Sequence, residues 1–156
     1  MPMTRRILFA FVVAALAACS RAQPGADPVA AVQPIYAPYI ENRNPPALLD
    51  VAPWTPELRA LLQSAQAASR ETGEPVIDFD PIIDGQDWQI AAVAVTLESP
   101  PADGRAEVAA RFNNQGDEVE VIFELVDAEG GWRVDNLRTE NWSLRAILAT
   151  AGIAEE

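Results

Sequence analysis

Four aspartates stand close together in the middle of the chain, at Asp78, Asp80, Asp84 and Asp87. Their segment has the sequence Asp-Phe-Asp-Pro-Ile-Ile-Asp-Gly-Gln-Asp-Trp and ends at Trp88. Clustered carboxylates coordinate Ca²⁺ in calcium loops and act as the acid–base pair of glycoside hydrolases. They also accept hydrogen bonds from the backbone amides of turns. The residue types therefore allow three interpretations of this acidic turn.

The first interpretation is a calcium loop of the EF-hand type, and its spacing fails here. Such a loop needs acids at positions 1, 3 and 5, glycine at position 6 and glutamate at position 12. With Asp78 at position 1, Asp80 fits position 3, but positions 5 and 6 are isoleucines and position 12 is Gln89. A looser oxygen site formed by Asp80, Asp84 and Asp87 stays open as an alternative.

The second interpretation is a hydrolase, which would need two carboxyl groups roughly 5–9.5 Å apart across a sugar-binding cleft. Nothing in the sequence indicates such a cleft. We favour the third interpretation, in which Pro81 and Gly85 shape a turn and the aspartates accept hydrogen bonds from its amides. The large apolar residues of the segment would then enter the core: Phe79, Ile82, Ile83 and Trp88.

Composition excludes most catalytic designs. The chain has one cysteine, Cys19, and no histidine or lysine. These absences exclude histidine-dependent nucleophilic catalysis, imidazole-bound metals and disulfides, and no glycine-rich phosphate loop is present. We therefore expect no catalytic residue, no metal and no cofactor. The formal net charge of −12 argues against nucleic-acid binding, which needs a basic surface.

The N-terminus has the layout of a bacterial secretion signal over residues 1–18, with Arg5 and Arg6 before an apolar run. That run is shorter than the roughly 20 residues that a membrane-spanning helix needs. It ends Leu-Ala-Ala-Cys at Cys19, which resembles the lipobox of bacterial lipoproteins. The resemblance implies cleavage before Cys19 and lipidation of that residue. Ser20 after the cysteine favours the periplasmic face of the outer membrane, whereas the export route, general or twin-arginine, stays open.

The elements that must position the acidic turn follow from periodicity. Residues 19–26 are expected to form a lipidated tether, and 27–153 a single domain. Tyr36 and Tyr39 lie on an apolar face at helical spacing, in a helix that Pro34 and Pro38 should kink or break. They could line a pocket, although we favour core positions for both. Residues 42–56 are expected to be a loop.

A second helix should begin after Thr55, with proline and glutamate in its first turn, and should end at Gly73. Residues 89–97 form an apolar run that predicts a central strand covered on both faces. Residues 105–112 and 119–125 alternate as strands around a four-residue connection at 113–116, which would pair Arg111 with Glu118, Arg105 with Glu124 and Val108 with Val121. A last strand at 132–137 and a helix capped by Asn141 or Ser143 complete the chain.

This order predicts an α+β domain in which N-terminal helices pack on a four-stranded antiparallel meander with a C-terminal helix. The cone-shaped nuclear-transport-factor-2-like arrangement is our preferred analogy. Arg133 is expected to pair with Glu124 across the strands. A sharper alternative pairs Arg133 or Arg145 with an aspartate of the acidic turn and lowers the pKa of that aspartate.

Two short motifs carry a family resemblance. The first is Phe79-Asp80-Pro81 followed by Gln86-Asp87-Trp88, and the second is Gly131-Trp132-Arg133-Val134-Asp135-Asn136 followed by Ser143-Leu144-Arg145 and Leu148. Together with the lipobox, they resemble the domain-of-unknown-function 3828 family of bacterial envelope lipoproteins, over residues 28–152. The resemblance implies a location and a domain type, and no catalytic residues.

We therefore expect a non-catalytic lipoprotein that binds the membrane through its N-terminal lipid and serves an envelope protein partner as a binding or accessory module. One alternative is a small-ligand or cation pocket lined by Tyr36, Tyr39 and the acidic turn. The other is an acidic inhibitor of a cationic enzyme that degrades the envelope.

Overall fold

A computed structural model describes residues 27–154 of the chain. The expected signal peptide at 1–18 and the lipidated tether at 19–26 lie outside the described residues. Within 27–154, no helix is both long enough and apolar enough to cross a membrane.

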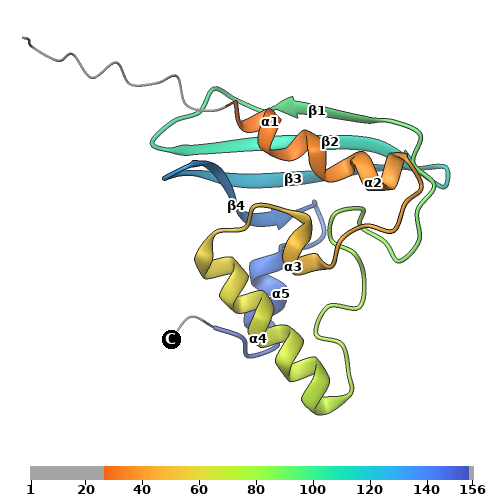
Figure 1. Ribbon diagram of the computed structural model, residues 1–156, viewed down its shortest axis with the longest axis vertical. Coiled ribbons are helices and arrows are strands. Elements are labelled where there is room, and N and C mark those ends of the chain that lie inside the picture. The colour runs from red at the N-terminus through yellow and green to blue at the C-terminus, as the bar shows by residue number, and fades with distance from the viewer. Residues whose placement is uncertain (1–26, 155–156) are drawn as a thin grey trace, which may run out of the picture.

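The N-terminal helical segment is broken, as its prolines predict. It consists of α1 (Pro28–Val32), a 3₁₀ turn η1 (Gln33–Tyr36) and α2 (Ala37–Ile40). Asp27 Oδ1 accepts a hydrogen bond from the Val29 amide at 3.0 Å and caps the first turn. The segment lies across one face of the sheet (Figure 1) and buries Val32, Tyr36 and Tyr39 there.

Two helices follow. The expected loop at 42–56 is wrong in part, because α3 (Leu48–Val51) forms one helical turn inside it. The Trp54 indole N–H donates to the Leu48 carbonyl at 2.7 Å and holds this turn in place. The longest helix, α4 (Pro56–Thr72), begins and ends as predicted: Thr55 Oγ1 accepts from the Leu58 amide at 3.2 Å, and Gly73 ends it with φ +76°.

The sheet is a four-stranded antiparallel meander in the order β1–β2–β3–β4. Its strands are β1 (Val93–Leu97), β2 (Arg105–Asn114), β3 (Asp117–Ala128) and β4 (Gly131–Arg138). The prediction of a central strand at 89–97 is wrong: β1 is short, lies at the edge and is exposed at several positions. Its Val- and Ala-rich sequence therefore reports β propensity rather than burial on both faces.

The predicted β2–β3 register is also wrong, by two residues. Arg111 lies opposite Glu120 and Val108 opposite Phe123, because the connection is the two-residue turn Gln115-Gly116. Both turn residues have positive φ, 56° and 107°, as in a type I′ hairpin. A shift of two residues leaves every side chain on its expected face, so Ala106, Val108, Ala110 and Phe112 are buried as predicted.

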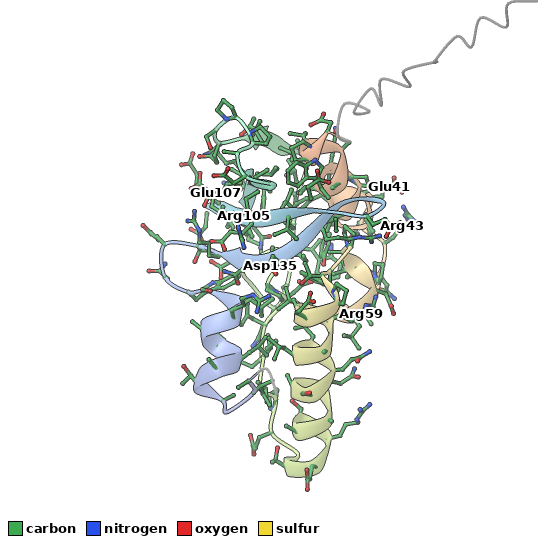
Figure 2. The ribbon with its side chains drawn as sticks, turned by 90° about the vertical axis from the view of Figure 1, so that its left-hand side faces the viewer. Glu41, Arg43, Arg59, Arg105, Glu107 and Asp135 are labelled. Atoms are coloured by element: carbon green, nitrogen blue, oxygen red, sulfur yellow. The ribbon has the colours of Figure 1, made fainter. Side chains whose placement is uncertain are left out.

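The last helix, α5 (Leu144–Thr150), buries Leu144 and Leu148. Ser143 stands at the cap position, but its side chain makes no cap hydrogen bond with the helix and bonds Asn136 instead. Figure 2 shows α4 and α5 projecting from the same end of the sheet, where they contact each other and β4. The expected α+β fold, with N-terminal helices on a four-stranded meander and a C-terminal helix, is confirmed; the narrower comparison with the nuclear-transport-factor-2-like arrangement stays an analogy.

Candidate functional site

The acidic turn is closed by Asp80. The Asp80 carboxylate Oδ1 accepts from the Ile82 amide at 2.9 Å, and its own amide donates to the Gly85 carbonyl at 2.8 Å. Asp84 adopts φ +50°, a left-handed conformation that aspartate tolerates better than most residues. Ile82 and Ile83 point into the core and are fully buried. These contacts support the interpretation of Asp80 as the cap of its own turn.

Two tyrosines fasten this turn to the N-terminal helical segment. The Tyr39 hydroxyl donates to Asp80 Oδ2 at 2.6 Å, and the Tyr36 hydroxyl donates to the Ile82 carbonyl at 2.8 Å. Burial raises the pKa of both phenols well above the ordinary value. Burial also raises the pKa of Asp80, although its hydrogen bonds from Tyr39 and Ile82 act in the opposite direction. Both residues are core tyrosines, as favoured, and Tyr39 in addition lines a surface pocket.

The other three aspartates of the turn do not converge with Asp80. Asp78, Asp84 and Asp87 are exposed, and Asp84 Oδ1 accepts from the Trp142 indole N–H at 2.7 Å. The carbonyl oxygens of Asp78 and Asp87, rather than their carboxylates, accept hydrogen bonds from side-chain amides. Over residues 27–154, no cluster of three acidic side chains is arranged to hold a metal ion. The looser oxygen site considered from the sequence therefore has no geometric support.

The arginines are placed differently from the expectation. The tight β3–β4 turn sets Ala128 opposite Gly131, and this register sets Arg133 opposite Val126. The predicted pair of Arg133 with Glu124 is therefore wrong, and Glu124 accepts from Arg138 Nε at 2.7 Å. Arg145 forms an ion pair with Asp135 of β4 at 2.7 Å, so it braces the strand rather than the acidic turn.

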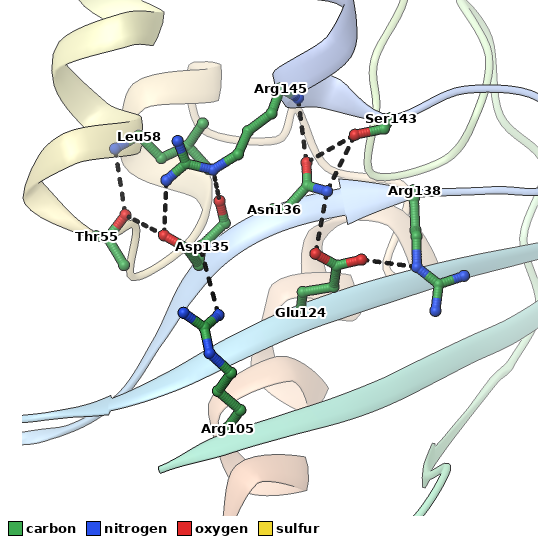
Figure 3. A network of polar contacts seen from close by, with 9 residues as sticks. All are labelled: Thr55, Leu58, Arg105, Glu124, Asp135, Asn136, Arg138, Ser143 and Arg145. Atoms are coloured by element: carbon green, nitrogen blue, oxygen red, sulfur yellow. Dashed lines mark hydrogen bonds and ion pairs between the residues drawn. The ribbon is translucent and has the colours of Figure 1, made fainter. Parts of the chain in front are cut away.

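A polar network around Asp135 is a feature that the sequence analysis missed. The β3–β4 register shifts between Glu124 and Leu125, which leaves Asp135 as an extra residue in a β-bulge. Its carboxylate accepts hydrogen bonds from Arg145 at 2.7 Å and from the Thr55 hydroxyl at 3.3 Å, and Arg105 lies 3.9 Å away (Figure 3). The network ties β4 to the start of α4 and to α5. In the sequence, the bulge could have been recognised from the adjacent polar residues Asp135 and Asn136, because they interrupt the alternation of apolar and polar residues along the strand.

An apolar groove lies beside the acidic turn and is the second feature that the sequence did not reveal. One part, of about 280 Å³, is lined by Tyr39, Pro46, Leu48, Val51, Ile77, Phe79, Asp80 and Pro81. The other, of about 220 Å³, is lined by Leu48, Leu49, Leu62, Ala65, Gln66, Ser69, Pro75, Val76 and Ile77. The two parts are neighbouring pockets, since Leu48 and Ile77 line both, and we call the pair the apolar groove. Asp80 is the one lining residue of either part that is charged at neutral pH.

Both walls of the apolar groove are held by hydrogen bonds. On one side, α3 is fixed by Trp54 and by Arg59 Nη2, which donates to the Leu49 carbonyl. On the other, the extended chain after Gly73 is fixed to α4, because the Val76 amide donates to Ser69 Oγ at 2.9 Å. Its far end is fixed by Tyr39 on Asp80. These hydrogen bonds hold both walls and the far end of the groove in place.

A larger hollow of about 700 Å³ lies near Asp84, between the β2–β3 hairpin and residues 139–141. Its lining side chains are mostly polar or charged, and the carboxylates among them are Asp84, Glu118, Glu120 and Glu140. Its cation, Arg111, is already held by Glu98 and Glu120. Because ligand sites are mostly apolar with a few polar groups, the apolar groove is the better candidate.

Comparison with known proteins adds little. No family model and no curated protein matches the chain. One solved structure shows some similarity, the phospholipid-binding protein from Ralstonia solanacearum in complex with a phospholipid, at 15% identity and a TM-score of 0.36. The match covers 81% of this chain and 62% of that protein, so the chain spans less than two thirds of its length. A similarity of this size carries no argument about function.

Proposed function

We propose that this protein is a lipid-anchored, non-catalytic binding module of the bacterial envelope. Cys19, in its lipobox-like setting, is the anchor, and the domain faces the periplasm from the outer membrane. The motif in the acidic turn and the motif that begins at Gly131 resemble those of the domain-of-unknown-function 3828 family, and this resemblance supports the same location. The absence of histidine and lysine from the chain supports binding rather than catalysis.

The apolar groove is the observation that carries the proposal. The carboxylate that could have acted as a catalyst, Asp80, is engaged by Tyr39 and by the Ile82 amide, and so serves to hold the groove. Apolar side chains of α3, α4 and residues 75–77 form its walls. A recess lined by apolar side chains and one carboxylate is suited to hold a small amphiphilic molecule. The protein therefore binds its ligand in this groove.

The test is binding of an uncharged, environment-sensitive dye such as Nile red to the Cys19→Ala chain. Gln66 is exposed and lines the groove, so Gln66→Trp should fill part of the volume without disturbing the core. Gln63→Trp places the same side chain at an exposed position of α4 that does not line it. We expect dye fluorescence to rise with wild type and Gln63→Trp and to be largely lost with Gln66→Trp. Equal binding by the two tryptophan variants would contradict the proposal.

The anchor is tested separately, by fractionating cells that express wild type or Cys19→Ala. Several acyl chains, each CH₂ contributing about 0.8 kcal/mol, should hold the wild type in the outer-membrane fraction. Cys19→Ala should appear in the soluble periplasmic fraction. If that variant stays in the membrane fraction, the lipid anchor is refuted, whereas the proposal that the groove binds a ligand is not affected.

A further inference from the structure

The apolar groove has one charged group, and its position is asymmetric. Asp80 lines the part between α2, α3 and the acidic turn, whereas the part along α4 is lined by apolar residues together with Gln66 and Ser69. Ser69 Oγ is already used, as donor to the Ala65 carbonyl and acceptor from the Val76 amide. A ligand therefore meets the Asp80 carboxylate at one end of the groove and mostly apolar side chains along the rest.

Asp80 has capacity for a further partner. Its two carboxylate oxygens accept one hydrogen bond each, from Ile82 and Tyr39, whereas an ionised carboxylate offers about four acceptor sites. The side chain is half-buried, and this burial raises its pKa because the charged form is poorly solvated. A cation placed at the carboxylate would restore the missing solvation.

We propose that the apolar groove binds a protonated amine that carries an apolar body, with the ammonium group at Asp80 and the body along Leu48 and Ile77. This inference rests on the proposed function, because it names the ligand class of the same groove. The net charge of −12 draws cations toward the protein as a whole. An apolar anion, such as a fatty acid, would place its carboxylate against Asp80 and is rejected.

The experiment is calorimetric titration of the Cys19→Ala chain with three ligands of one chain length, octylamine, octanol and octanoate, below the concentrations at which they form micelles. Octylamine should bind, and octanol at least about tenfold more weakly, because only the ammonium group adds an opposite charge to its hydrogen bond with the Asp80 carboxylate. Octanoate should not bind detectably. Shortening the amine from octyl to hexyl should weaken binding about fourfold for each CH₂ lost. Gln66→Trp should weaken octylamine binding, and Gln63→Trp should not.

Head-group recognition is tested by Asp80→Asn against Asp84→Asn. Asparagine at position 80 can still accept from the Ile82 amide and can donate to the Tyr39 oxygen, so the turn is kept. Asp80→Asn should remove the preference for octylamine over octanol. Asp84→Asn, an exposed acid of the same turn outside the groove, should keep it.

The results separate two claims: that the groove is the binding site, and that its ligand is a protonated amine. If octanol binds as tightly as octylamine and Gln66→Trp weakens both, the amine inference fails and the groove remains the binding site. If octylamine binds equally well to wild type, Gln66→Trp and Asp80→Asn, it binds elsewhere and the inference is overturned. If none of the three ligands binds, both the inference and the groove as a small-molecule site fail. The first and third comparisons need only wild type and Gln66→Trp, so they decide the matter even where Asp80→Asn folds poorly.

Discussion

Replacing Asp80 by alanine tests whether the acidic turn is a structural device. The change removes the acceptor of two hydrogen bonds, from the Tyr39 hydroxyl at 2.6 Å and from the Ile82 amide at 2.9 Å. Both donors belong to buried residues, since Tyr39 is 1% exposed and Ile82 is 0% exposed. Alanine therefore leaves two polar groups without a partner in the interior.

The magnitude follows from those two groups. A buried donor without a partner costs roughly 1–3 kcal/mol, so Asp80→Ala, which leaves two, should lower the free energy of unfolding by about 2–6 kcal/mol. A domain of this size has only about 5–15 kcal/mol in total. The midpoint of thermal unfolding should fall by about 10 °C. Asp80→Asn keeps the acceptor for the Ile82 amide and can donate to the Tyr39 oxygen, so only the Tyr39 hydroxyl proton loses its acceptor. It should therefore cost less than Asp80→Ala, about 1–2 kcal/mol.

The assay is urea unfolding of the Cys19→Ala chain, followed by tryptophan fluorescence. Asp87→Ala is the matched control, because Asp87 is an exposed acid of the same turn whose carbonyl, not its carboxylate, accepts from Asn114. It should change stability by no more than about 0.5 kcal/mol. The reasoning is refuted if Asp80→Ala is as mild as Asp87→Ala.

Three further predictions concern stability. Because burial raises the pKa of Asp80 above its ordinary value, the folded state holds this proton more tightly than the unfolded chain does. The contribution of Asp80 to stability should thus grow as pH falls from its raised folded-state pKa to its ordinary pKa. The free energy of unfolding of wild type minus that of Asp80→Asn should therefore increase as pH is lowered through this window. A difference that does not change with pH would count against the shift. Thr55→Ala removes the cap of α4 and should cost about 1–2 kcal/mol in urea unfolding, whereas Thr150→Ala, at the exposed end of α5, should cost clearly less. Gln115→Asn creates the Asn-Gly pair that a type I′ turn prefers and should raise stability by up to about 0.5 kcal/mol in the same assay; a loss would contradict the turn geometry.

Local signals in the sequence predicted much of the fold. The Thr55 cap, the proline after it and Gly73 defined α4, and Pro34 and Pro38 explained the broken first segment. Alternation identified the faces of β2 and β3. The same signals could not determine the register, because a two-residue slip preserves the alternation, and only the positive φ at Gln115 and Gly116 distinguishes the two hairpins.

The site was harder to predict, because its contacts join residues far apart in the chain. Asp80 was recognised as a turn residue, but its bond to Tyr39 spans 41 positions. The apolar groove needs α3 to face residues 75–77, and α3 lies in a proline-rich stretch for which the sequence predicts a loop. The Asp135 network depends on a bulge that only the pairing with β3 reveals. Contacts between residues far apart in the chain produce no periodic pattern of residue types, so a single sequence does not reveal them.

The most direct test of the groove as the binding site is a titration of the ¹⁵N-labelled Cys19→Ala chain with octylamine, followed by backbone amide NMR spectra. The predicted result is that saturable shifts concentrate in α3, in the second half of α4 and in residues 75–81. Shifts at the larger hollow instead, around Asp84 and residues 139–141, or no saturable shifts at all, would contradict it.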